Sequence, residues 1–210
     1  WLDWFPHLPS YQAFNRRLNL LADNFQVLFT HLLQNLHSAR NRSSSDFLID
    51  SMPIMMACGV HSNKARVAPE IAKTGYSAVK QTHFYGVRLH LIANKQTSSL
   101  PLPSKVWLKE GNVHDLVALQ EIADELPPGI NLYGDKAYAD EHFRIELKRQ
   151  QIQLFTPIKK PKKAELTKEQ KRFNRTISKI RQPVESFFKW LIDKTDIQRA
   201  SSVRSTEGLI

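Results

Sequence analysis

The chain lacks several features that mark other classes of protein. Cys58 is its single cysteine among 210 residues, which excludes an internal disulfide bond and a cysteine-based metal cage and fits a reducing cytoplasm. No run of about 18 apolar residues is present to cross a bilayer. The first residues show no basic stretch followed by an apolar one, as a secretory signal would. We therefore expect a cytoplasmic protein with no membrane partner.

Negative charge is also scarce. The sequence has 30 Lys and Arg against 20 Asp and Glu, which gives a net charge of +10 and a pI of about 9.8. Because each neutralised phosphate releases condensed counterions, such an excess favours a nucleic-acid partner; a solvated basic surface is the alternative. Apolar residues make up 41% and charged residues 24%, so the composition predicts an ordinary globular protein rather than a disordered one.

The N-terminal part has the pattern of an amphipathic helix. Its apolar residues recur at steps of three and four, and Ser10 stands where a helix cap is expected. They are Phe14, Leu18, Leu21, Phe25, Leu28, Leu32 and Leu36. We expect residues 1–45 to form a helical segment that leads into a core of residues 46–210, and the whole to be a piece of a longer protein, cut at both ends.

The rest of the chain predicts an α/β fold. Short apolar or alternating runs indicate strands, and apolar residues at helical spacing indicate helices, in the order strand, strand, strand, helix, strand, helix, strand, helix. The strands are expected at 47–50, 84–92, 106–108, 130–133 and 152–158, and the helices through 116–123, 143–148 and 173–191. This order predicts a mixed sheet flanked by helices. Pro183 inside the last helix predicts a bend or a restart there.

Three carboxylates stand out by their settings. Asp50 and Asp135 each lie at the end of a predicted strand, and Glu185 lies at the edge of the apolar stripe of the last helix. A lone carboxylate is costly to bury unless it is paired or binds metal. Oxygen ligands that converge from two strand ends and a helix suit Mg²⁺. Two such ions about 3.5–4 Å apart can drive an in-line phosphodiester displacement.

At these residues the sequence resembles the DDE transposases of bacterial insertion sequences. The three carboxylate motifs are Ile49-Asp50-Ser51, Tyr133-Gly134-Asp135-Lys136-Ala137-Tyr138 and Arg181-Gln182-Pro183-Val184-Glu185. The linking segments at 75–78, 84–90 and 111–115, and the N-terminal segments at 5–11 and 14–17, are also similar to that family. Each motif alone is weak, but their order and spacing are fairly specific, and together they cover nearly the whole chain.

The resemblance implies an RNase H-like (retroviral-integrase-like) fold of about five strands, with Asp50, Asp135 and Glu185 as catalytic residues and metal ligands. It implies Mg²⁺ or Mn²⁺ as cofactor, two ions in all, and cleavage of transposon ends followed by strand transfer into target DNA. The expected partner is double-stranded DNA in a bacterial nucleoid, and the expected assembly on DNA is a homodimer. Some relatives carry a Tyr and a Lys where this chain has Ser178 and Ile192, so those helper roles are not carried over.

Four cations are candidates for contacts with DNA phosphates: Arg181, Lys136, Arg88 and Lys189. One guanidinium group can bind two phosphate oxygens at once. An ion pair between Arg181 and Glu185, four residues apart on one helix, is the alternative for that arginine. The basic turn at 159–163 fits a solvated loop and a binding site equally well.

Other acidic and histidine residues compete with these assignments. Asp46 is better explained as a residue at the start of a strand, and Asp115 as a helix cap. His90 and His114 lack the spacing of a zinc site. No helix-turn-helix is evident, so recognition of specific DNA ends is not predicted within this segment. Two alternative functions remain open: an RNase H-like nuclease that never joins DNA, and an inactive remnant that only binds it.

Overall fold

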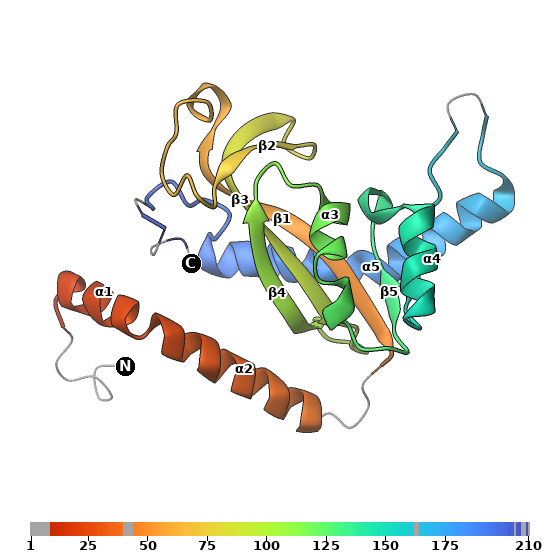
Figure 1. Ribbon diagram of the computed structural model, residues 1–210, viewed down its shortest axis with the longest axis horizontal. Coiled ribbons are helices and arrows are strands. Elements are labelled where there is room, and N and C mark those ends of the chain that lie inside the picture. Colours follow the sequence, from red (N-terminus) through yellow and green to blue (C-terminus); the bar gives the residue numbers. More distant parts are fainter. Residues whose placement is uncertain (1–8, 40–43, 162–163, 204, 207–208, 210) are drawn as a thin grey trace.

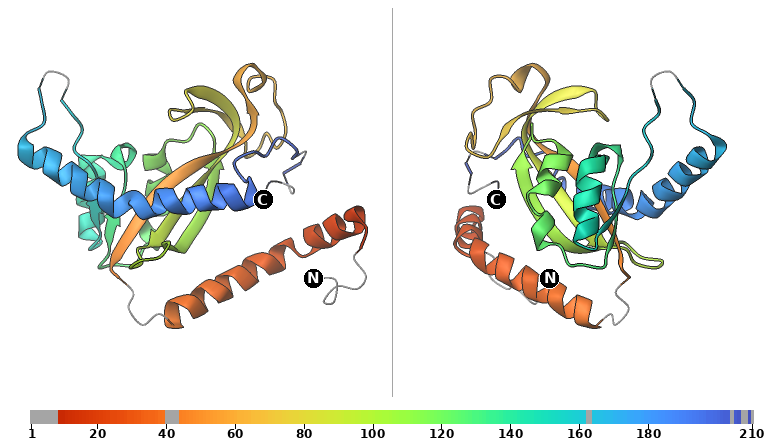
Figure 2. Two further views of the ribbon diagram at one scale, coloured as in Figure 1. Left: turned by 180° about the vertical axis from the view of Figure 1, so that it is seen from behind. Right: turned by 45° about the vertical axis from the view of Figure 1, so that its right-hand side comes forward.

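The computed structural model describes residues 9–39, 44–161, 164–203, 205–206 and 209. A mixed β-sheet forms the centre, with α3 (Asp115–Gln120) and α4 (Glu141–Arg149) on one face and α5 (Lys168–Thr195) across the other (Figures 1 and 2). Within the described residues no helix is long and apolar enough to span a membrane. This layered architecture confirms the predicted α/β class and is consistent with an RNase H-like fold.

Six strands make up the sheet, one more than the sequence predicts. They are β1 (Asp46–Cys58), β2 (Lys73–Ser77), β3 (Thr82–Asn94), β4 (Leu102–Glu110), β5 (Asn131–Tyr133) and β6 (Gln153–Phe155). The order is β2-β3-β1-β5-β6, and β4 also pairs with β3. The first four strands pair antiparallel, whereas β1–β5 and β5–β6 pair parallel. The sheet is therefore mixed, with its parallel part around β5.

The alternation of β1 divides the core in two. Leu48 and Met52 belong to the apolar cluster that α5 covers, while Ile49 belongs to the cluster beneath α3 and α4. Since successive side chains of a strand point to opposite faces, Asp50 shares the α5 face with Leu48 and Met52. Ser51 faces α3.

The structure differs from the predicted strands in two ways. β1 runs on to Cys58, so Asp50 lies inside the strand and not at its end. Pro53 does not end the strand. Because β5 pairs only with residues 46–48, no hydrogen bond to β5 requires an N–H at position 53. β2 was not predicted, because its residues are mostly polar and exposed and only Gly75 and Ser77 are buried.

The predicted N-terminal helix is two helices. α1 (Tyr11–Leu20) and α2 (Ala22–Ala39) are separated at Leu21, and the Ser10 hydroxyl accepts a hydrogen bond from the Ala13 N–H as its predicted role as cap requires. Residues 5–8 of the N-terminal motif lie outside the described residues. The apolar stripe of these helices is largely exposed, since Phe14, Leu21 and Leu28 are each about half accessible.

α5 does not restart at its internal proline. Its 28 residues form one helix through Pro183, and Figure 2 shows that it bends part-way along, as an internal proline predicts. A capping box between Thr167 and Gln170 begins it, and Asp196 in the left-handed conformation ends it. Glu185 therefore lies inside a continuous helix rather than in the first turn of a new one.

Gly75 shows how closely β2 approaches the end of β4. A Cβ atom at this position would lie 2.0 Å from the carbonyl oxygen of Gly111 and 3.0 Å from the ring of Phe84. A backbone oxygen cannot rotate away, so Gly75→Ala is expected to lower the free energy of unfolding by about 1–3 kcal/mol. Urea denaturation measures the change. Ser178→Ala, at an exposed helical position, is the control and should change stability by less than about 0.5 kcal/mol; equal effects of the two would contradict the close approach.

Candidate functional site

The parallel pairing of β1 with β5 brings Asp50 and Asp135 together. Leu48 is the register partner of Tyr133, the last residue of β5, so Asp50 in β1 and Asp135, two residues after β5, lie at the same end of this parallel pair. Their charges interact, because Asp135 is one of the groups that raise the pKa of Asp50. The sheet thus supplies two neighbouring carboxylates, which we call the carboxylate pair.

Asp50 is held from both sides. The Arg181 guanidinium of α5 donates from Nη2 to its Oδ2 at 3.1 Å, and the Ser51 backbone N–H donates to its Oδ1 at 2.9 Å. Its side chain is one-fifth exposed. Burial raises the pKa of Asp50 to about 7, although Arg181 and the Ser51 hydrogen bond act in the opposite direction. Asp50 is therefore a carboxylate that a nearby positive charge would favour strongly in its ionised form.

Asp135 begins a short 3-10 turn, Lys136–Tyr138, and its Oδ1 accepts from the Ala137 N–H at 2.7 Å. Gly134 makes this turn possible, since a Cβ there would lie 2.8 Å from the ring of Tyr138 and 3.1 Å from Ile49. Tyr138 is fully buried under the turn. The turn fixes the side chain of Asp135 next to β1.

Glu185 lies one helical turn beyond Arg181 on α5, and side chains four residues apart on a helix are neighbours. It is exposed. The structure pairs Arg181 with Asp50, and not with Glu185 as the alternative interpretation supposed. Among the described residues no three His, Cys, Asp or Glu side chains gather closely enough to hold a metal ion. Glu185 thus lies one helical turn from the arginine that contacts Asp50, without joining the carboxylate pair.

The carboxylate pair fits a magnesium ion by the chemistry of its donors. Mg²⁺ prefers hard oxygen ligands and is commonly held by one or two carboxylates, with water and substrate phosphates in the remaining positions. Asp50 and Asp135 meet that requirement at one edge of a partly open site.

Comparison with known proteins decides the family. The family model of the transposase DDE domain matches residues 41–204, which is most of the chain. The chain belongs to this family. It is also 33% identical over 97 residues to a transposase for insertion sequence element IS1106 of Neisseria meningitidis serogroup B, a match that covers 46% of this chain and 34% of that protein.

Asp115 is a part of this DDE domain that the sequence did not reveal. His114 caps α3 through its Nδ1, so the predicted capping role of Asp115 is wrong. Instead Asp115 Oδ1 accepts a hydrogen bond from the Ser51 hydroxyl at 2.6 Å. A continuous chain of contacts therefore runs from Asp115 through Ser51 to Asp50 and across the sheet to Arg181. The local sequence could not show the contact between Ser51 and Asp115, because 64 residues separate them along the chain.

The four candidate DNA contacts of the transposase domain have different surroundings. Arg181 is buried against Asp50. Arg88 donates to the carbonyl oxygens of Tyr76 and Gly111 and lies 3.8 Å from Asp115. Lys136, beside Asp135, and Lys189, one turn after Glu185, are exposed. The two lysines are therefore open to solvent near the site, whereas the two arginines are engaged within the protein.

The competing residues have structural roles. Asp46 is the first residue of β1 and accepts a hydrogen bond from the Asn131 side chain at 2.9 Å, which agrees with its interpretation as a strand-start residue. His90 is fully buried, stacks on Trp107 at 5.2 Å and lies 3.9 Å from Asp115. Neither His90 nor His114 belongs to a metal-binding group among the described residues.

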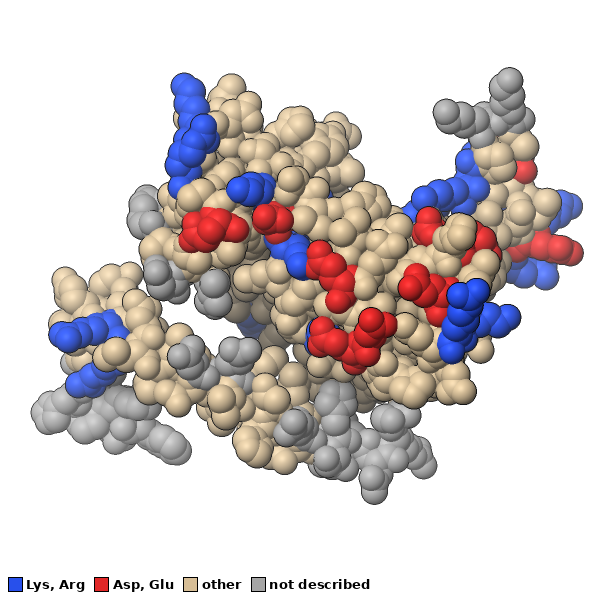
Figure 3. All heavy atoms as spheres, in the orientation of Figure 1, with Lys and Arg blue, Asp and Glu red and all other residues tan. Residues whose placement is uncertain are grey.

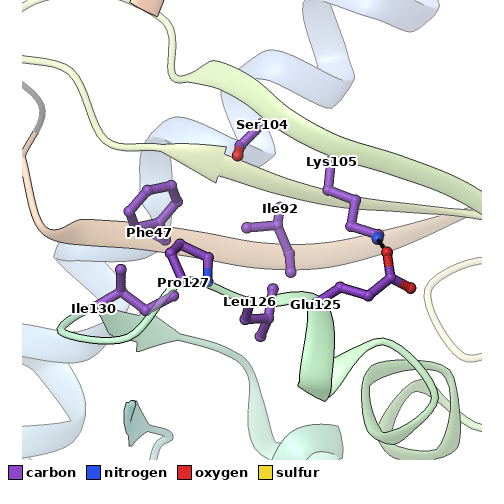
Figure 4. A pocket seen from close by; sticks show the side chains of 8 residues that line it. All are labelled: Phe47, Ile92, Ser104, Lys105, Glu125, Leu126, Pro127 and Ile130. Carbon is purple, nitrogen blue, oxygen red and sulfur yellow. Dashed lines mark hydrogen bonds and ion pairs between the residues drawn. The ribbon is translucent and has the colours of Figure 1, made fainter. Parts of the chain in front are cut away.

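A pocket of about 260 Å³ lies away from the carboxylate pair (Figure 4). Phe47, Ile92 and Ile130 line it near the amino ends of β1 and β5, on the face opposite α5, and its Lys105 and Glu125 form an ion pair with each other. Its charged groups are thus already neutralised, and its lining offers no catalytic arrangement.

His90 makes the stability of the domain depend on pH. Burial lowers the pKa of His90 from 6.5 to about 4, with Asp115 acting against this and Arg88 with it. The unfolded chain therefore takes up a proton between pH 6.5 and 4 that the folded chain does not. The contribution of His90 to stability is complete above pH 6.5 and is lost as the pH falls through about 4.

We expect wild-type protein to lose about 2 kcal/mol more unfolding free energy than His90→Gln between pH 7.5 and 5. Urea denaturation at both pH values measures the difference. His142→Gln, at an exposed position on α4, is the control and should follow the wild type. Parallel losses in wild type and His90→Gln would rule out a buried, uncharged His90.

Proposed function

We propose that this chain is the catalytic domain of a transposase that cuts DNA at the ends of an insertion sequence and joins the cut ends to target DNA. The observation that carries the proposal is the parallel pairing of β1 with β5, which brings Asp135 close enough to raise the pKa of Asp50, the carboxylate that Arg181 of α5 contacts. Membership of the DDE family and the match to an insertion-sequence transposase support it.

Asp50 and Asp135 would hold a divalent cation, Mg²⁺ or Mn²⁺, with Glu185 as the third ligand and a second ion shared with the DNA. When bound, such ions activate the attacking oxygen and stabilise the leaving oxygen of a phosphodiester displacement. Arg181 holds the carboxylate of Asp50 in place, and Lys136 and Lys189 contact phosphates on either side.

The same displacement serves both steps. In cleavage, a water oxygen bonds to phosphorus, the bond from phosphorus to the 3′ oxygen breaks, and a free 3′-hydroxyl remains. In joining, that 3′ oxygen bonds to a phosphorus of the target strand, and the bond between this phosphorus and the 3′ oxygen of the target strand breaks, which leaves a 3′-hydroxyl on the target. No net bond is lost in joining, so no external energy source is needed.

We expect Asp50→Asn, Asp135→Asn and Glu185→Gln each to lower the rates of cleavage and joining at least about a hundredfold, which is about 2.7 kcal/mol of transition-state stabilisation. Duplex oligonucleotides that carry an element end serve for cleavage, and pre-cut ends with a target plasmid serve for joining, in Mg²⁺ or Mn²⁺. Asp193→Asn, at an exposed position near the end of α5, is the matched control and should retain both activities.

The outcome also separates the alternatives. Cleavage without any joined product from pre-cut ends would identify a nuclease and contradict the joining step. Normal DNA binding with no metal-dependent product in the wild type would identify a remnant that only binds DNA. Full activity in Glu185→Gln would remove that residue from the proposed set.

A further inference from the structure

Most of the excess positive charge of the chain lies in one short stretch. Residues 159–179 contain nine Lys and Arg against two Glu, so a tenth of the sequence carries seven of its ten net charges. We call this stretch the basic arm; its Lys162 and Lys163 lie outside the described residues. Figures 1 and 2 show that the helical part of the arm, the first half of α5, projects beyond α4 and away from the sheet.

The helical half of the arm carries its cations in a row. Because successive helical residues are about 100° apart, four cations fall within a sector of about 60° and extend over about 16 Å. They are Lys168, Arg172, Arg175 and Lys179, and all four are exposed. In the part of the chain that the structure describes, none of them forms an ion pair with an acidic side chain, whereas Lys160 and Lys171 both pair with Glu165.

The row is held in a fixed orientation. The side chain of Asn174 accepts from the N–H of Ile158 at 2.7 Å and donates to its carbonyl oxygen at 3.1 Å, which ties the helix to the segment after β6. Ile177, on the same side of the helix, is buried in the core. The four cations lie on the opposite side of α5 from these anchors. They are therefore presented to solvent by a rigid support.

Outside the arm, several surface cations pair with neighbouring acids, as Lys105 does with Glu125 and Lys109 with Glu121. Figure 3 shows Asp and Glu side chains across the centre of one face and, toward the end where α4 and the start of α5 lie, Lys and Arg side chains with acidic ones among them; further Lys and Arg side chains lie toward the opposite end. A row of like charges on one helical face costs stability, because like charges three and four residues apart repel each other. A polyanion would relieve that cost.

We propose that the four cations of this row in the basic arm bind the phosphate backbone of double-stranded DNA, independently of base sequence, at a place separate from the carboxylate pair. Duplex DNA carries one negative charge per about 1.7 Å of its axis, so a row of about 16 Å can engage several phosphates at once. The four cations face away from Arg181, so they contact DNA beyond the bonds that are cut. The inference rests on the proposed function, which supplies the DNA.

The test measures duplex binding by fluorescence anisotropy in EDTA, over a series of KCl concentrations. A variant with Lys168, Arg172, Arg175 and Lys179 all changed to Gln is compared with one in which four exposed cations elsewhere, Arg16, Arg17, Lys64 and Lys194, are changed to Gln. Both variants lose the same charge. Thermal unfolding confirms that each is folded.

We expect the arm variant to reduce the slope of log affinity against log salt by about 3–4 and to weaken binding at least tenfold at 0.1 M KCl. The control variant should change the slope by less than 1. Arg175→Gln alone should lower the slope by about 1, which keeps the test valid if the fourfold variant unfolds. Equal effects of the two fourfold variants on the salt slope would overturn the proposal. So would poly-glutamate that competes with the duplex for the arm as well as unlabelled duplex DNA does.

Asp135→Asn separates this inference from the proposed function. It should bind duplex DNA with the wild-type salt slope, because the arm does not need the carboxylate pair. A wild type that shows no cleavage but keeps an arm-dependent slope would overturn the proposed function and leave the arm standing. Cleavage by the wild type, together with duplex binding that the arm variant does not change, would overturn the arm proposal and leave the proposed function standing.

Discussion

The ion pair between Asp50 and Arg181 is the contact on which the arrangement of the site depends. A carboxylate in the interior of a central strand, beneath a helix, is unfavourable unless a positive group accompanies it. Arg181 supplies that group from α5, 131 residues further along the chain, so the helix can pack on the sheet only where the two side chains meet. That contact fixes α5 along its axis and, with it, the position of Glu185 one turn further on.

The sheet and the helix together give the domain two separate electrostatic regions. At the carboxylate pair, burial and the neighbouring Asp135 and Asp115 raise the pKa of Asp50, and a cation bound there would favour its ionised form. Along the basic arm, four cations that form no ion pair within the described residues face solvent on the far side of the same helix. α5 therefore links a region suited to a metal ion with a region suited to phosphates, and its length determines the distance between them.

The order of the elements could be predicted from the sequence because apolar periodicity carries it; the strands around Asp50 and Asp135 and the helix of Glu185 all appear in their predicted order. The sequence could not predict the length of β1, because the apolar run that indicates the strand ends at Asp50. β2 was missed because its residues are mostly polar. The partners of Arg181 and Asp115 depend on register between distant segments, which no local pattern records.

The most direct test of the account is manganese binding in the presence of duplex DNA, followed by electron paramagnetic resonance. The account predicts that the wild-type chain takes up Mn²⁺ and that Asp50→Asn and Asp135→Asn, both folded, lose that uptake while still binding the duplex. Unchanged uptake in both variants would contradict it, because the metal would then be held by groups other than the carboxylate pair.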